Sequence, residues 1–108
     1  MKVELAMEDY LSQVEKEFQR GERLAKELEK VIEKIKQEVK PLRDGVYDSA
    51  SNIGQIRNKA EAEITDIVKQ ARKLGLDSSD AYKSWTKVNN LSREYAQKLD
   101  RYWQRAKL

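Results

Sequence analysis

Five basic side chains in the last third of the chain are the residues of this sequence best suited to bind a charged ligand. On a helix they fall in one narrow angular sector opposite the apolar positions, and Glu94 interrupts the series. Ammonium and guanidinium groups in such a line can follow the phosphates of a polyanion, because each contact releases a condensed counterion. The candidate polyanion-binding residues are Lys83, Lys87, Lys98, Arg101 and Arg105.

Recognition of nucleobases would also need aromatic rings among these charges, because single-stranded nucleic acids bind largely by base stacking. The pattern instead places Trp85, Tyr95, Tyr102 and Trp103 mainly on the inward side of the same helix. We therefore interpret the basic sector as a solvated polar face. Any DNA or RNA binding is expected to be weak, salt-sensitive and indifferent to sequence, with a Kd of about 10⁻⁴–10⁻⁶ M near physiological salt.

Two aromatic residues, Tyr82 and Trp103, fall toward the edges of the apolar pattern. Partly exposed aromatic side chains anchor many protein interfaces, so both residues are candidates for binding a partner. The alternative is that these rings cap the core of a small bundle. The sequence favours this second interpretation, because a small core leaves many aromatic rings at its edge.

The residue types that most often perform catalysis or bind metals are missing. The 108 residues include no cysteine and no histidine, which excludes disulfides, thiolate metal sites and the commonest general base. Glu61 and Glu63 point to different faces of a helix, and Asp77 and Asp80 suit helix capping. Nucleotide-binding loops and nucleophile motifs are absent from the sequence. We expect a protein that is not an enzyme and that binds no metal and no cofactor.

Three stretches of apolar residues at heptad spacing define the elements that must position these side chains. They predict helices over residues 7–40, 46–74 and 79–106. Pro41 is expected to end the first helix before a turn at residues 42–45, and Gly75 to end the second in the left-handed conformation. Near-equal lengths and short turns predict an all-α fold: an up-down-up antiparallel three-helix bundle with coiled-coil-like heptad packing. It would form a single domain over residues 1–108.

Two residues interrupt the apolar series and need an explanation. Counting equal numbers of residues on either side of each predicted turn places Gly21 at the same height along the bundle as Ile67 and Trp85. We therefore hypothesise that Gly21 makes room for the Trp85 indole. Arg57 falls between apolar positions, where its guanidinium either pairs with a carboxylate or extends its head into water. The acidic candidates at the same level are Glu29, Glu33 and Glu94. We favour the arrangement in which the Arg57 head reaches water.

Composition limits both the class of protein and its compartment. Charged residues make up 38% and hydrophobic residues 39%, which is too apolar for a disordered chain and too charged for a membrane protein. No run approaches the ~20 apolar residues that a membrane helix needs, and no signal peptide is recognisable. We predict a cytoplasmic protein without membrane contact. The net charge is +3, and the basic excess lies in the last third of the chain.

One nine-residue segment is similar to part of a known family. Residues 42–50 read LRDGVYDSA, which resembles the turn of helical type VII secretion proteins of the LXG and WXG kind. In that family a long first helix ends in a Leu/Trp-x-Gly turn. The resemblance implies a small helical type VII secretion protein. This chain has an extra residue between Leu42 and Gly45, and its third helix departs from the family's hairpin plan, so no functional residue is carried across.

The helical pattern and the missing catalytic residues favour a non-catalytic helical protein-binding module, such as an adaptor, inhibitor or scaffold. We expect another protein as the partner, and a monomer or small homo-oligomer as the assembly. The main alternative is a nucleic-acid-binding accessory protein that uses the basic residues of the third helix. Residues 22–40 consist almost wholly of residues used in idealised designed helices, so an engineered or redesigned bundle without a natural ligand is a further hypothesis.

Overall fold

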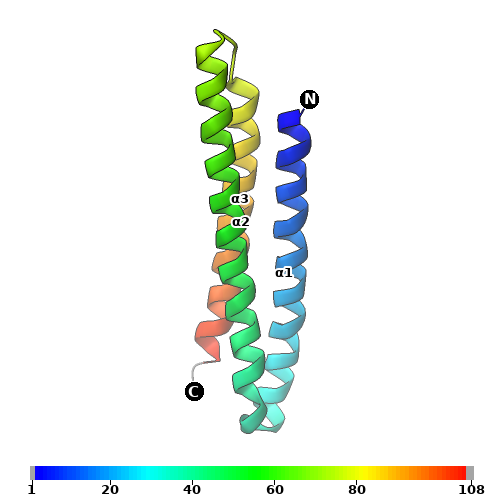
Figure 1. The fold of residues 1–108 in the computed structure, drawn as a ribbon. Helices are drawn as coiled ribbons and strands as arrows, with labels where there is room; N and C mark the ends of the chain where they lie inside the picture. The colour runs from blue at the N-terminus through cyan, green and yellow to red at the C-terminus, as the bar shows by residue number, and fades with distance from the viewer. Residues whose placement is uncertain (1, 107–108) are drawn as a thin grey trace.

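Three long helices account for most of the chain; the second runs antiparallel to the first and the third, which run in the same direction (Figure 1). The computed structural model describes the backbone of residues 2–106 and the side chains of residues 6–106. The helices are α1 (Lys2–Lys34), α2 (Val39–Lys73) and α3 (Ser79–Arg105), and each packs against the other two. They form a rod of 61 × 19 × 16 Å, with no strand among the described residues. The predicted all-α, up-down-up three-helix bundle is confirmed.

The connection between α1 and α2 lies earlier than the sequence suggested. Helix α1 ends at Lys34, Ile35 is extended with φ −144° and ψ 99°, and a short 3₁₀ helix, η1 (Lys36–Glu38), leads directly into α2. The predicted helix over residues 7–40 therefore ends too late, and the predicted start of the second helix at residue 46 is wrong. Pro41 lies in the first turn of α2, where its missing N–H has no helical partner to lose.

Residues 42–45 are helical and not a turn, which corrects the prediction made from Pro41 and Gly45. The likeness of this segment to the turn of type VII secretion proteins therefore does not extend to its conformation. The residues that do turn, Lys36, Gln37 and Glu38, include neither glycine nor proline. Lysine, glutamine and glutamate all favour helices, so nothing in their types marked the connection.

The displaced connection changes which residues lie at the same level of the bundle. The connection comes about seven residues earlier than predicted. A residue of α1 therefore faces a residue of the next helix that is about fourteen positions, or two heptads, away from the predicted one. A Cβ added to Gly21 would lie 2.8 Å from a methyl of Leu99 and 3.0 Å from Cβ of Ser49. Gly21 thus makes room for Leu99 and Ser49, and the hypothesis that it accommodates Trp85 is wrong.

The connection between α2 and α3 has the predicted form. Gly75 has φ +68°, a left-handed conformation that other residues rarely adopt. The Gly75 N–H donates to the Arg72 carbonyl at 3.2 Å, and the Leu76 N–H donates to the Ala71 carbonyl at 2.8 Å. This pair of bonds is the Schellman arrangement that closes a helix C-terminus. The Asp77 carboxylate then accepts the Ser79 N–H at 2.9 Å at the start of α3.

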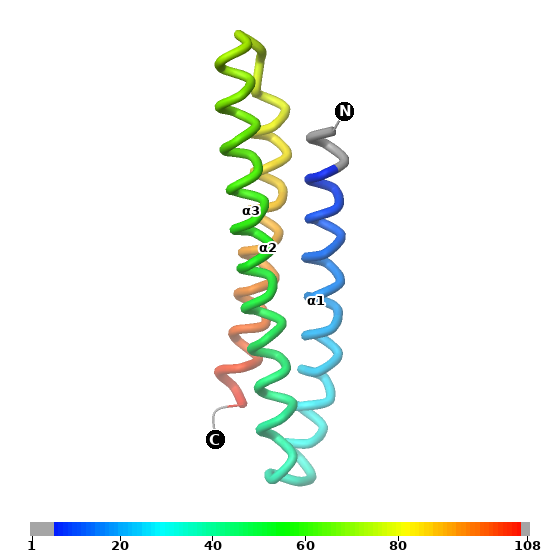
Figure 2. The backbone as a smooth tube through the Cα atoms, in the orientation of Figure 1, coloured from blue at the N-terminus to red at the C-terminus, as the bar shows by residue number. Residues whose placement is uncertain are grey.

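The buried hydrophobic side chains form three clusters, and each cluster draws on more than one helix. Figure 2 shows the alternating directions of the helices that supply them. The predicted heptad positions supply most of this core. On α2, heptad spacing predicts a series that includes Val46, Ala50, Ile53, Ala60, Ile64 and Ile67. Ala50 and Ile67 are only half-buried, and their neighbours Ser49 and Val68 are buried instead. The buried positions of α2 thus differ from the predicted ones at these two places, by one residue in opposite directions. The largest fully buried hydrophobic side chains are Met7, Leu28, Ile53, Leu99, Val14, Val46 and Val88.

Candidate basic and aromatic groove

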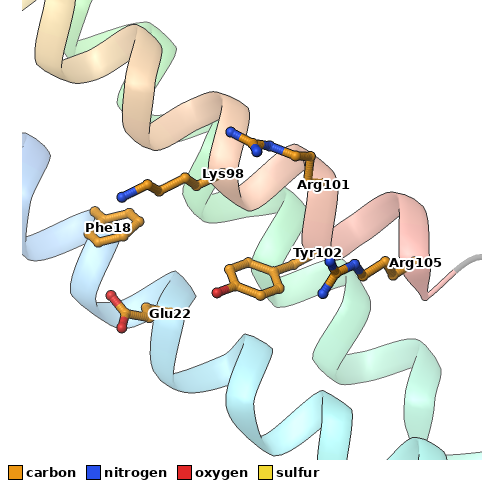
Figure 3. A pocket seen from close by; sticks show the side chains of 6 residues that line it. All are labelled: Phe18, Glu22, Lys98, Arg101, Tyr102 and Arg105. Atoms are coloured by element: carbon orange, nitrogen blue, oxygen red, sulfur yellow. The ribbon is translucent and has the colours of Figure 1, made fainter.

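A groove between α1 and α3 brings together three of the five predicted polyanion-binding residues. Its volume is about 350 Å³. Figure 3 shows Lys98 and Tyr102 reaching from α3 toward α1, where Phe18 and Glu22 lie. Helix positions 98, 101, 102 and 105 share this side of α3, while Phe18 and Glu22 are one turn apart on α1. The lining residues are Phe18, Glu22, Lys98, Arg101, Tyr102 and Arg105.

Aromatic rings form part of this groove, contrary to the sequence-based expectation. The Phe18 and Tyr95 rings are stacked, with centroids 3.9 Å apart and planes at 12°. The Lys98 Nζ lies 5.6 Å from the Phe18 centroid and 6.0 Å from the Tyr95 centroid, close enough for cation–π attraction. Burial raises the pKa of Tyr95, and the nearby carboxylates of Glu15, Glu94 and Glu22 add to this shift. The prediction that rings and charges lie on separate sides is wrong for Tyr95 and Tyr102.

The cations of the groove remain accessible to a ligand. All three basic side chains are exposed. The Lys98 Nζ lies 3.7 Å from the Glu94 Oε1, and the Arg105 Nη1 lies 3.9 Å from the Glu29 Oε1. Both ion pairs are exposed. Such pairs contribute little free energy, so an incoming anion can replace the carboxylate. Arg101 has no ion pair within the described residues.

The other two predicted polyanion-binding residues belong to a different groove. Lys83 and Lys87 lie nearer the start of α1, around a space of about 310 Å³. Glu8 and Asp80 line the same space and balance the two positive charges. The five basic residues therefore do not form one uniform site. The groove at Lys98 is lined by three cations and one carboxylate, Glu22, whereas the groove at Lys83 is lined by two cations and two carboxylates.

The two candidate partner-binding aromatics lie in different surroundings. Tyr82 is 46% exposed in the first turn of α3, close to the α2–α3 connection. Trp103 is half-buried, with its ring 5.2 Å from the ring of Tyr47 and 5.9 Å from the guanidinium carbon of Arg43. Tyr47 itself is 53% exposed. The sequence did not single out Tyr47, because its contact is with Trp103 on another helix, which spacing along one helix does not reveal.

Arg57 is half-buried, and none of its predicted acidic partners forms an ion pair with it among the described residues. Its Nη2 donates to the Asn58 amide oxygen at 3.4 Å, while its Nε is buried without a hydrogen-bond partner. The register-setting ion pair considered from the sequence is therefore not formed. A long apolar stem with the head at the surface explains how this residue fits between apolar positions.

A polar contact between α1 and α2 was not anticipated from the sequence. The Tyr10 hydroxyl donates a hydrogen bond to the Glu63 carboxylate, and the two residues are 53 positions apart. This bond raises the pKa of Tyr10, with burial as the second cause. Both residues lie at the edges of their helix faces, where heptad spacing carries no information about a partner.

The described residues contain no cluster of three or more acidic, histidine or cysteine side chains that could hold a metal ion. None of the helices in residues 2–106 has a stretch that is long and apolar enough to cross a lipid bilayer. The groove between α1 and α3 thus stands out for its combination of cations and rings. Comparison with protein-family models, with curated proteins and with solved structures found no match to this chain.

Proposed function

We propose that the chain is a non-catalytic helical module that binds another protein through the tip of the α2–α3 hairpin. The observation that carries this proposal is the exposure of large apolar side chains at that tip. Leu74 is 73% exposed, Leu76 is 61% exposed, and Tyr82 is 46% exposed. Leucine at such exposure leaves apolar area in water that a partner could cover.

The shape of the bundle supports this choice of surface and indicates the kind of partner. Figure 1 shows the α2–α3 hairpin extending past the first turn of α1, and at the opposite end the α1–α2 connection extending past the last turn of α3, so each end of the described rod has two helices. An amphipathic helix that takes the third position would cover the exposed leucines. Helix-in-groove binding of this kind relies on apolar anchors one helical turn apart. We therefore propose an amphipathic helix of another protein as the occupant.

The test compares wild-type protein with one double variant and one single control variant, each immobilised on the same kind of beads. Wild-type protein, Leu74→Gln/Leu76→Gln and the control Ile35→Gln are incubated with a lysate of the native host. Ile35 is 49% exposed at the opposite end of the rod, so its replacement removes exposed apolar area far from the proposed surface. The captured protein is then purified and its Kd measured.

We expect the double variant to weaken binding of the purified partner at least tenfold and the control to leave it unchanged. Equal binding by all three proteins would contradict the proposed surface. Recovery of nucleic acid alone, or of nothing, would contradict the protein-binding function.

A second function, nucleic-acid binding, has one specific observation in its favour. Lys98, Arg101 and Arg105 line a single groove, and two of them are only loosely paired with carboxylates. Three phosphate contacts would make the affinity fall with salt, with a slope of about −2 to −3 on logarithmic axes. Replacing these three residues with glutamine should abolish oligonucleotide binding and leave the helical content unchanged, because all three are exposed. Binding that survives the triple replacement would place the site elsewhere.

A further inference from the structure

We propose that the groove between α1 and α3 is a site for single-stranded nucleic acid, in which a base contacts the Phe18 and Tyr102 rings. The inference rests on the second proposed function, nucleic-acid binding, and adds the ligand class and the residues that select it. It depends on α1 and α3 lying side by side, because Phe18 and Glu22 come from α1 while Tyr102 and the three cations come from α3.

The distribution of charge across the groove would orient a bound nucleic acid. All three cations, Lys98, Arg101 and Arg105, come from α3, and they follow one another by three and four residues. Successive cations are therefore about one helical turn, or ~5 Å, apart along α3. The groove's carboxylate, Glu22, comes from α1 and pairs with Lys26 on its own helix at 3.4 Å. Phosphates are attracted to the α3 edge and repelled from the α1 edge, so the bases point toward α1.

The rings occupy the side toward which the bases would point. Phe18 is half-buried on α1, and its stacking on Tyr95 holds its plane in place. Tyr102 is also half-buried and reaches across from α3 toward Glu22 (Figure 3). Rings that are held in position and still partly exposed are suited to stack with a base, since little side-chain freedom remains to be lost. A space of about 350 Å³ suits one flat ring rather than a folded domain.

This combination distinguishes a single strand from other polyanions. A duplex offers phosphates to the three cations but keeps its bases stacked inside, where Phe18 and Tyr102 cannot reach them. An acidic peptide offers carboxylates but no flat ring. A single strand offers both groups at once, and stacking is tolerant of sequence because every base has a π-face. The expected ligand is therefore single-stranded DNA or RNA without strong sequence preference.

The experiment measures fluorescence anisotropy with labelled 12-nucleotide oligo(dT), with a duplex of equal length, and with poly-glutamate as a competitor, at 50 and 200 mM salt. The variants are Tyr102→Leu, Arg101→Gln and the control Tyr47→Leu. Tyr47 is an exposed ring on α2 outside this groove. Circular dichroism verifies that each variant keeps its helical content.

We expect oligo(dT) to bind at least tenfold more tightly than the duplex. Tyr102→Leu should weaken oligo(dT) at least fivefold and leave the duplex unchanged, a size typical of losing one base–aromatic stack. Arg101→Gln should weaken both, and Tyr47→Leu should weaken neither. Equal affinity for oligo(dT) and duplex, unaffected by Tyr102→Leu, would overturn the single-strand site and leave nucleic-acid binding standing. Binding of poly-glutamate alone, or of no polyanion, would overturn both.

Discussion

The middle of the rod and the tip of the α2–α3 hairpin differ in what their side chains contact. In the middle, Leu99 is fully buried against the helix of Gly21, and a Cβ at that glycine would lie only 2.8 Å from a Leu99 methyl. At the tip, Leu74 and Leu76 are mostly exposed although they are as apolar as any core residue. Stability is therefore concentrated in the layers where three helices meet. The tip contributes little to folding, which leaves its leucines available for another molecule.

The largest expected effect separates a buried leucine from an exposed one. Leu28→Ala should destabilise the fold by about 2–5 kcal/mol, because Leu28 is 2% exposed and its removal leaves a cavity. Leu74→Ala should change stability by no more than about 0.5 kcal/mol, since that side chain is already in water. Urea unfolding followed by circular dichroism measures both. Similar losses for the two variants would show that the tip is covered in solution.

A second comparison uses two glycines inside helices. Gly21→Ala places a methyl group 2.8 Å from the Leu99 side chain, so overpacking of about 1–3 kcal/mol should outweigh the gain in helix propensity. Gly54→Ala meets no atom within 4 Å and should stabilise by about 0.5–1 kcal/mol. Thermal melts of the two variants test this opposite sign. A more stable Gly21→Ala protein would mean that Leu99 can move aside without strain.

The hydrogen bond from Tyr10 to Glu63 is expected to give a smaller effect that depends on pH. Tyr10→Phe should cost about 0.5–1.5 kcal/mol at neutral pH. Because the pKa of Tyr10 is raised in the folded state, this stabilisation is fully present below the unfolded pKa of ~10. It is lost as the pH rises through the folded pKa. The stability difference between wild type and Tyr10→Phe should therefore shrink in alkaline solution, and a constant difference would argue against this bond.

The smallest expected effect concerns the start of α3 beside the tip. The N–H and the hydroxyl of Ser79 both donate to Asp77, which lowers the pKa of that carboxyl. A lowered folded pKa gives stability that is present above the unfolded value of ~3.9 and is lost as the pH falls through the folded pKa. Asp77→Ala should therefore lower the melting temperature at pH 7 and have little effect at strongly acidic pH. An unchanged melt at pH 7 would show that this cap does not stabilise α3.

The two connections show why one part of the fold could be predicted and another could not. The α2–α3 connection depends on local chemistry: a glycine that accepts positive φ, and an aspartate whose carboxylate accepts the first N–H of the next helix. Both signals are visible in the residue types. The α1–α2 connection has no such signal, because Lys36, Gln37 and Glu38 suit a helix as well as a turn. Pro41 was interpreted as a stop, although proline in the first turn of a helix is equally compatible with its geometry.

The candidate groove illustrates the same limit for function. Spacing along α3 identified Lys98, Arg101 and Arg105, since residues three or four apart share a helix face. The same spacing could not place Phe18 and Glu22, because they are about 80 positions earlier in the chain and belong to another helix. It also assigned Tyr102 to the interior, whereas the ring lies at the margin between core and groove. The position of this margin depends on how closely two helices approach each other. The apolar pattern of one helix does not give that distance.

The order of residues is enough to predict three amphipathic helices and the face of each that is mainly apolar, because burial of apolar area follows the helical period. The level at which the helices meet is set by their packing in three dimensions. That level brings Gly21 against Leu99 and Ser49, and Phe18 beside the cations of α3. A heptad pattern looks the same after a shift of one or two heptads, so the level depends on the first connection and on the fit of particular side chains.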